Sequence, residues 1–285
     1  MKKITGIMLV IALMLGMTTA TFANVIPSSK QSCYTISEFD MLETLAKESK
    51  SELKQDGYSQ EEIAEIKEYE TLYQKHIEEL GNLSDERLRN WGYSEEELSI
   101  IRNFQGTTEE MRALSAKVTI NITDENFKFQ SKETYTTGTL NYSWKWTKKP
   151  MSQATDLIAF AWNDWAVKAS SSYVKYYDMT TGVLTKGEPA QKIQPTSVVS
   201  GVGGNGYKFP LVQGNLFAKE GNGYFKLQSD VHIAKDCYYG MAYGHTTLAL
   251  SVGYSIGKSG LDPTFAFKSG IENMASINGC AKVKA

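Results

Sequence analysis

The sequence predicts an α+β protein in which an acidic N-terminal helical region precedes an antiparallel β-sandwich or barrel-like domain. The first observation is charge. Residues 34–115 hold 20 acidic and 9 basic residues, whereas residues 116–285 hold 12 acidic and 18 basic residues. The second is composition, since 17 of the 23 glycines, 11 of the 16 tyrosines and four of the five tryptophans follow residue 116. The third is a change of hydrophobic period from helical to alternating at that point.

The N-terminal stretch has the pattern of a secretory signal peptide. Lys2 and Lys3 precede an apolar run, and small residues follow it up to Ala23, the expected cleavage point. The apolar run is short for a membrane span. We therefore expect an exported, Gram-positive-type bacterial protein, with a linker over residues 24–36 and a helical region over residues 37–116.

The helical region contains an internal repeat. Leu53–Tyr69 aligns with Leu88–Phe104, and each copy holds a Gly-Tyr-Ser corner with a glutamate three residues after the serine. In the first copy, Ser59 is placed to cap a new helix while Glu62 reaches back to it, which is the capping-box pattern. Because capping explains these residues, we expect a small helical bundle. A partner-binding or masking module is the alternative.

The β domain is expected over residues 117–285. Alternation of apolar and polar residues is typical of antiparallel strands with one buried and one solvated face. It occurs in KVTINIT from Lys117, in TLNYSWKWT from Thr139 and in GYFKLQSDVHI from Gly223. The stretch DLIAFAW, Asp156–Trp162, is apolar on both faces, so we expect it to form a central strand.

A glycine pattern at residues 201–206, GVGGNG, fits the G-x-G-x-x-G of dinucleotide-binding loops. That loop requires a following helix whose N-terminus binds the pyrophosphate, yet Pro210 and a strand-like stretch follow here. The near copies GNGYKF and GNGYFK, starting at Gly204 and Gly221, instead suggest tight hairpin turns. We therefore expect no nucleotide and no other cofactor.

Three cysteines in an exported chain favour one disulfide. Cys237–Cys280 is the expected pair because both residues lie in the second half, and Cys33 is the alternative partner.

The histidines offer one catalytic candidate. His232 and Asp230 share one face of an expected strand, so a secreted hydrolase with a site near this pair is an alternative function. His232, Cys237 and His245 have a spacing that matches no zinc site, and no metal is expected.

Two segments combine aromatic residues with lysines, NYSWKWTKKP from Asn141 and AFAWNDWAVKASSSYVKYYD from Ala159. Such rings form a sandwich core, or they settle at an anionic membrane interface or stack on sugars. The candidate binding residues are Trp144, Trp146, Trp162, Trp165, Tyr173 and Tyr177.

The leading functional hypothesis is a non-enzymatic exported protein that binds an anionic membrane or cell-wall surface. The acidic helices are expected to dock on the basic β domain, where they mask its binding face. Nucleic acid is not an expected partner, because a net charge of +6 over residues 116–285 is modest. An extracellular structural or matrix protein is a further alternative.

Overall fold

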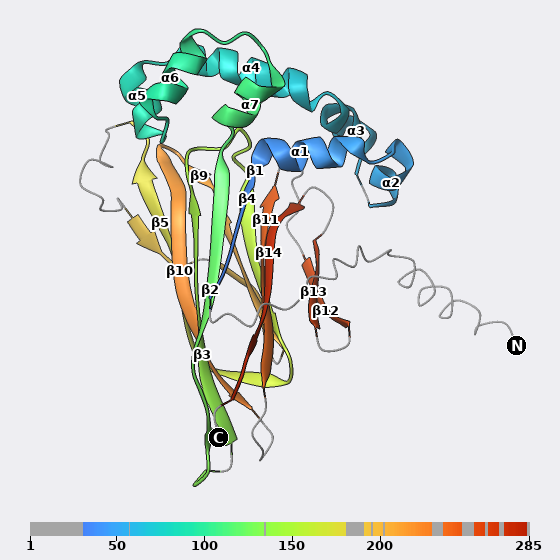
Figure 1. Cartoon of the computed structure of the whole chain (residues 1–285), viewed down its shortest axis with the longest axis vertical. Helices are drawn as coiled ribbons and strands as arrows, with labels where there is room; N and C mark the ends of the chain where they lie inside the picture. The colour runs from blue at the N-terminus through green and yellow to red at the C-terminus, as the bar shows by residue number, and fades with distance from the viewer. Residues whose placement is uncertain are drawn as a thin grey trace, which may run out of the picture.

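The computed structural model describes residues 31–56, 58–133, 135–180, 191–194, 196–201, 203–229, 236–246, 254–259, 262–267 and 271–283. The expected leader over residues 1–23 lies outside these residues, as do His232 and Asp230. Within the described part of the chain, short helices gather over one end of a pair of long β-sheets (Figure 1).

The helices begin at serine or threonine caps in all cases but one, α4, because these side chains satisfy backbone N–H groups of the first turn. Among the described residues, none of the helices has the length and apolar character needed to cross a membrane. They are α1 (Glu38–Lys47), α2 (Lys50–Gln55), α3 (Gln60–Lys67), α4 (Tyr69–Gly81), α5 (Asp85–Asn90), α6 (Glu95–Arg102) and α7 (Thr108–Leu114).

Both copies of the repeat form the same cap at the start of a helix. The Glu62 backbone N–H donates to the Ser59 hydroxyl over 3.1 Å, and the Ser59 N–H donates to the Glu62 carboxylate over 2.6 Å. Ser94 and Glu97 repeat this pair with distances of 3.3 and 2.8 Å. The capping-box prediction is therefore confirmed at the start of α3, and α6 has the same cap.

The strands form two large antiparallel sheets and one hairpin. The larger sheet has the order β1 (Gln31–Ser37), β2 (Lys117–Gln130), β3 (Tyr135–Trp146), β10 (Leu216–Ser229), β5 (Trp165–Asp178) and β6 (Gln191–Ile193), with β9 (Val212–Gln213) beside β10. The smaller sheet has the order β14 (Ile271–Ala281), β11 (Cys237–Thr246), β4 (Thr155–Trp162), β8 (Gly204–Pro210) and β7 (Thr196–Gly201). The hairpin pairs β12 (Tyr254–Ser259) with β13 (Asp262–Phe267).

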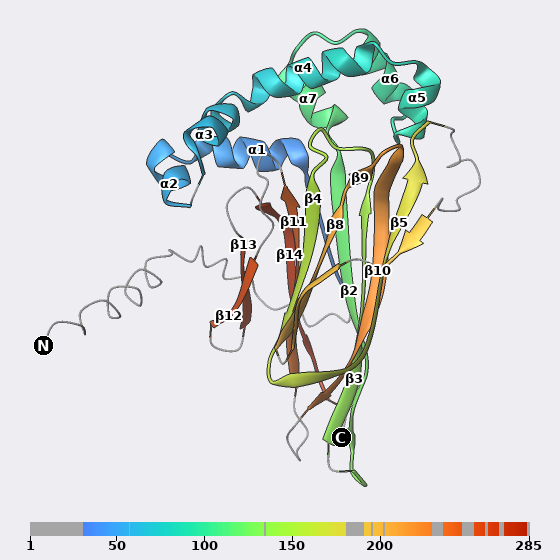
Figure 2. The same ribbon diagram turned by 180° about the vertical axis from the view of Figure 1, so that it is seen from behind.

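The two large sheets pack face to face as a sandwich, with β4 and β8 of the smaller sheet against β3 and β10 of the larger (Figure 2). Aromatic rings join them: Trp144 of β3 stacks on Phe209 of β8 with ring centroids 4.8 Å apart, and Phe225 of β10 packs on Phe160 of β4 at 4.8 Å. The α+β prediction is confirmed, and of the two β architectures expected the structure has the sandwich. β4 lies mid-sheet, as predicted.

Part of the expected linker is a strand. β1 pairs with β2 from Gln31 opposite Thr123 to Ser37 opposite Lys117. The sequence QSCYTIS shows little apolar alternation, so its backbone pairing with β2 determines the strand rather than its own pattern. The prediction of a linker up to residue 36 is therefore wrong from Gln31 onward.

The two GNG sequences are not turns. Gly204 begins β8, and Gly221 and Gly223 lie within β10. A Cβ at Gly221 would overlap the Trp144 indole of the neighbouring strand, and a Cβ at Gly223 would overlap the Tyr142 ring. The glycines thus make room for large side chains of β3. The turn itself precedes β8, where Gly203 has a φ of +90°.

Candidate functional site

A groove of about 500 Å³ crosses the outer face of the larger sheet. Its lining residues come from β2, β3, β10 and β5 and from the residue that follows β3. They are Thr119, Asn121, Ser143, Trp144, Lys145, Trp146, Thr147, Lys175, Glu220, Gly221 and Asn222. The side chains of Ser143 and Lys145, which alternate with the two tryptophans of β3, point outward because successive residues of a strand face opposite sides.

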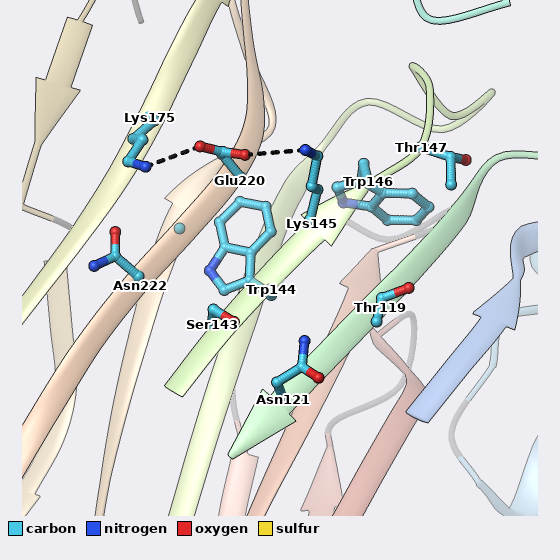
Figure 3. A pocket seen from close by; sticks show the side chains of 11 residues that line it. Thr119, Asn121, Ser143, Trp144, Lys145, Trp146, Thr147, Lys175, Glu220 and Asn222 are labelled. Atoms are coloured by element: carbon cyan, nitrogen blue, oxygen red, sulfur yellow. Dashed lines mark hydrogen bonds and ion pairs between the residues drawn. The ribbon is translucent and has the colours of Figure 1, made fainter. Parts of the chain in front are cut away.

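Three charged side chains form one row of the groove, which we term the charged row: Lys145, Glu220 and Lys175 (Figure 3). Glu220 lies between the lysines, with Lys175 Nζ at 2.8 Å and Lys145 Nζ at 3.6 Å from its carboxylate oxygens. The Lys145 side chain is 63% exposed, against 30% for Lys175 and 22% for Glu220. One carboxylate between two ammonium groups leaves a net positive charge.

The ionisation of Glu220 is set by these neighbours. Partial burial raises the pKa of its carboxyl, but the hydrogen bonds and charge of Lys175 and the hydrogen bond from Tyr177 outweigh burial and hold the pKa below its ordinary value. Tyr177 donates to Glu220 over 3.1 Å. Glu220 is therefore a carboxylate at neutral pH.

A second row, which we term the polar row, consists of Asn121, Ser143 and Asn222 on β2, β3 and β10. Figure 3 shows it beside the charged row. Within the described part of the chain, none of these three side chains hydrogen-bonds to another residue. Their amide and hydroxyl groups, which both donate and accept, are thus available to a ligand. Tyr173 of β5 continues the row opposite Asn222.

The six aromatic candidates lie in different places. The tryptophans predicted to bind ligand are at most 2% exposed, so the prediction that these indoles contact a partner directly is wrong; they fill the core between the two sheets, with Trp162 on the smaller sheet and the other three on the larger. They are Trp144, Trp146, Trp162 and Trp165. Tyr177 is 6% exposed with its hydroxyl at the charged row, and Tyr173 is half-buried on the outer face.

A second cluster is buried between α1 and the smaller sheet. His245 Nδ1 lies 2.8 Å from Asp156 Oδ1, and its Nε2 lies 3.3 Å from Glu38 Oε1. Tyr243 donates to Asp156 over 2.6 Å and accepts from the Trp146 indole over 2.9 Å. All five side chains are fully buried. We term them the buried network.

Glu38 carries three further hydrogen bonds. The Tyr73 hydroxyl donates to it over 3.1 Å, and the backbone N–H groups of Met151 and Ser152 donate over 2.9 Å each. Burial raises the pKa of Glu38, but the hydrogen bond and charge of His245, with the two backbone donors, lower it below its ordinary value. The carboxylate is therefore ionised inside the protein.

His245 is the matching cation. Burial lowers its pKa, but the charge and hydrogen bond of Asp156 and the contact with Glu38 raise it to about 10. The imidazolium thus donates one N–H to each carboxylate. Glu38, Asp156 and His245 are all fully buried, so none of them can contact a substrate at the surface. We therefore assign the buried network to holding the helices on the sandwich.

The predicted disulfide is absent. In the β11–β14 pair, Cys237 lies opposite Ala281 and Cys280 lies opposite Tyr238, so the two thiols belong to opposite faces of the sheet. Cys237 is buried, whereas Cys280 lies beside Tyr238 and Lys282. The two cysteines form no disulfide, and the pairing prediction is wrong.

Sequence reasoning missed both rows of the groove and the buried network. The sequence does carry a signal for the groove, since Ser143 and Lys145 alternate with Trp144 and Trp146 along one strand. No comparable signal exists for the network, because Glu38 and His245 are 207 residues apart.

No protein-family model and no curated protein sequence matches the chain. Similar solved structures include the collagen-binding domain of a Staphylococcus aureus adhesin, with a TM-score of 0.28, 11% identity, and coverage of 56% of this chain and 95% of that chain. The collagen-binding domain of Erysipelothrix rhusiopathiae surface protein RspB has a TM-score of 0.27 and 10% identity, and the match covers 60% of this chain and 66% of that chain. AvmM, a macrocyclization catalyst of alchivemycin A biosynthesis, has a TM-score of 0.26 and 8% identity, and the match covers 58% of this chain and 89% of that chain. At these TM-scores the similarity assigns neither a family nor a ligand.

Proposed function

We propose that this chain is an exported binding protein that attaches to an anionic polymer surface of the cell envelope through the groove on its larger sheet. The observation that carries the proposal is the polar row. Asn121, Ser143 and Asn222 present hydrogen-bonding groups that no residue of the described chain satisfies. They lie beside a row with net positive charge.

The scaffold beneath the groove supports a recognition role. The groove lies on paired strands whose inner side chains are packed tryptophans, so its polar groups are held at fixed spacings. A ligand then meets a preformed site, which lowers the entropic cost of binding. None of the described residues that line the groove belongs to a helix.

The helical region has a structural role in this proposal. The sequence suggested that acidic helices mask the binding face of the β domain. Instead, α1 supplies Phe39 and Glu38 to buried clusters at the end of the sandwich, and Glu97 of α6 pairs with Lys148 just beyond β3. Deletion of this region would therefore expose residues of the hydrophobic core.

The test uses a triple alanine variant of the polar row, N121A/S143A/N222A. The wild-type protein should sediment saturably with purified bacterial cell walls, and the variant should lose at least about tenfold in affinity, since several hydrogen bonds of about 0.5–1.5 kcal/mol each are removed. The matched control is E125A/T139A/K226A, whose positions form a more distant row on the same three strands and the same face.

Two results would contradict the proposal. One is saturable binding to cell walls with the same affinity for the wild type, the polar-row variant and the control variant. The other is no binding to cell walls by a wild-type protein whose folding circular dichroism verifies.

A further inference from the structure

We propose that the ligand of the groove is a carboxylated polysaccharide, with its sugar rings along the polar row and a carboxylate at Lys145. This inference rests on the proposed binding function and names the ligand class. Spacing, charge and the aromatic residue at the end of the polar row each support it.

The spacing of the polar row suits sugar rings. Asn121, Ser143 and Asn222 are direct neighbours on adjacent strands, so their positions repeat every ~4.8 Å across the sheet. An extended polypeptide presents equivalent groups on one face only every ~6.8 Å, twice its rise of about 3.4 Å per residue. The interstrand repeat is instead close to the length of one pyranose ring. Amides and a hydroxyl also pair with sugar hydroxyls in either hydrogen-bonding sense.

The charged row selects an acidic ligand. Glu220 engages Lys175 closely at 2.8 Å, whereas its 3.6 Å separation from Lys145 is too long for a direct hydrogen bond. Lys145 is also the most exposed member of the row. Its ammonium group is therefore available to a ligand carboxylate, next to the hydroxyl-binding polar row.

Tyr173 ends the polar row with a half-buried ring on the outer face, directly opposite Asn222. An aromatic ring with one apolar face and a polar tip is suited to a partly wet contact. A sugar ring that follows the polar row reaches this side chain after Asn222, and its apolar C–H face can pack there.

Glu220 competes with the ligand in this arrangement. Its carboxylate lies where an acidic sugar would place its own charge, between Lys145 and Lys175. Replacement of Glu220 by glutamine keeps the shape of the side chain and removes the competing charge. The variant E220Q should therefore bind an acidic polymer more tightly than the wild type, which a purely structural role of Glu220 does not produce.

The experiment measures affinity of the full exported chain for polygalacturonate and hyaluronate, with methyl-esterified polygalacturonate, poly-L-glutamate and phosphatidylglycerol vesicles as comparisons. We expect binding to the two carboxylated glycans, weakened by esterification and by salt. Variant K145A should weaken it about two- to fivefold and E220Q should strengthen it by a similar factor, as expected for one exposed charge pair. Y173A should weaken it, and Y173F should restore it.

Lys226 provides the matched control for charge. It is exposed on β10, six residues from Glu220 and thus about 20 Å along the strand, beyond the ~8 Å screening length at physiological salt. Variant K226A should leave the affinity for polygalacturonate unchanged.

The outcomes separate this inference from the proposed function. Equal or tighter binding of poly-L-glutamate or of the vesicles overturns the polysaccharide assignment while the groove remains a binding site. Failure to bind either carboxylated glycan, or an E220Q variant with unchanged or weaker binding, also overturns it. Loss of cell-wall binding in N121A/S143A/N222A tests the proposed function independently of ligand class.

Discussion

His245 Nε2 lies 3.3 Å from Glu38 Oε1, and this contact joins the first residue of α1 to β11, 207 residues further along the chain. Both side chains are fully buried. One hydrophobic core cluster includes Phe39 of α1 and Trp146 of β3, whereas α2 and α3 pack in a separate cluster with Leu45 of α1. The helices other than α2 and α3 therefore share one interior with the sandwich, and we expect them to unfold together with it.

Replacement of Glu38 should test that coupling. In E38Q the imidazolium loses one of its two carboxylates while it remains buried, and removal of one partner from a buried ion pair costs about 3–5 kcal/mol. Urea denaturation followed by tryptophan fluorescence and by far-ultraviolet circular dichroism should give one shared, lower midpoint. The control is E65Q, since Glu65 is exposed on α3. Separate transitions for the two probes in the wild type would contradict a single interior.

The buried network predicts a pH dependence of stability. The pKa of His245 is about 10 in the folded protein against an ordinary value of 6.5, so the folded state holds one more proton than the unfolded state between these values. The free energy of unfolding should therefore fall as pH rises toward 10, and the full contribution of His245 is present below pH 6.5. The lowered pKa of Glu38 acts oppositely: its contribution is present above its ordinary value of 4.5 and is lost in acid.

The measurement is the free energy of unfolding of wild type and H245Q from about pH 5.5 to pH 10. The difference between the two should shrink as pH rises. A constant difference over this interval would show that His245 is not a buried cation.

The sequence predicted the parts of the fold that depend on local pattern. Alternation placed Leu140, Tyr142, Trp144 and Trp146 on one face of a strand, and all four are buried together. Serine followed by glutamate predicted the cap at Ser59. Such patterns show which residues share a face. They do not show which face is covered, and for this reason the prediction assigned ligand binding to the tryptophans rather than to Ser143 and Lys145, which alternate with them.

The features that the sequence did not predict all depend on contacts between residues that are distant in the chain. Gly221 is required by Trp144 of another strand, and β1 is a strand because β2 lies beside it. Cys237 and Cys280 do not pair because the register of β11 and β14 places them on opposite faces of the sheet, and their spacing in the sequence does not reveal this register. The buried network has the same origin, since Glu38, Asp156 and His245 come from α1, β4 and β11.

The state of the thiols gives another prediction. Alkylation of the denatured protein without reductant should label all three cysteines, because Cys237 and Cys280 form no disulfide. In the native protein Cys33 should react first, since it is exposed on β1, and Cys237 should react only on unfolding. Mass spectrometry of the labelled peptides distinguishes the sites. A Cys237–Cys280 bridged peptide in the unreduced digest would overturn the β11–β14 register.

The contact between Gly221 and Trp144 should make β10 intolerant of a methyl group. In G221A the new Cβ overlaps the indole nitrogen and the Tyr173 carbonyl oxygen, so the strand or the ring must shift. Overpacking of this kind costs about 1–3 kcal/mol. The control is G81A at the end of α4, where a Cβ meets no atom within 4 Å and alanine favours the helix by up to about 1 kcal/mol. In thermal denaturation, G221A should unfold at a lower midpoint temperature than the wild type, and G81A at an equal or higher one. Equal midpoints for the two variants would mean that Trp144 does not pack against this strand.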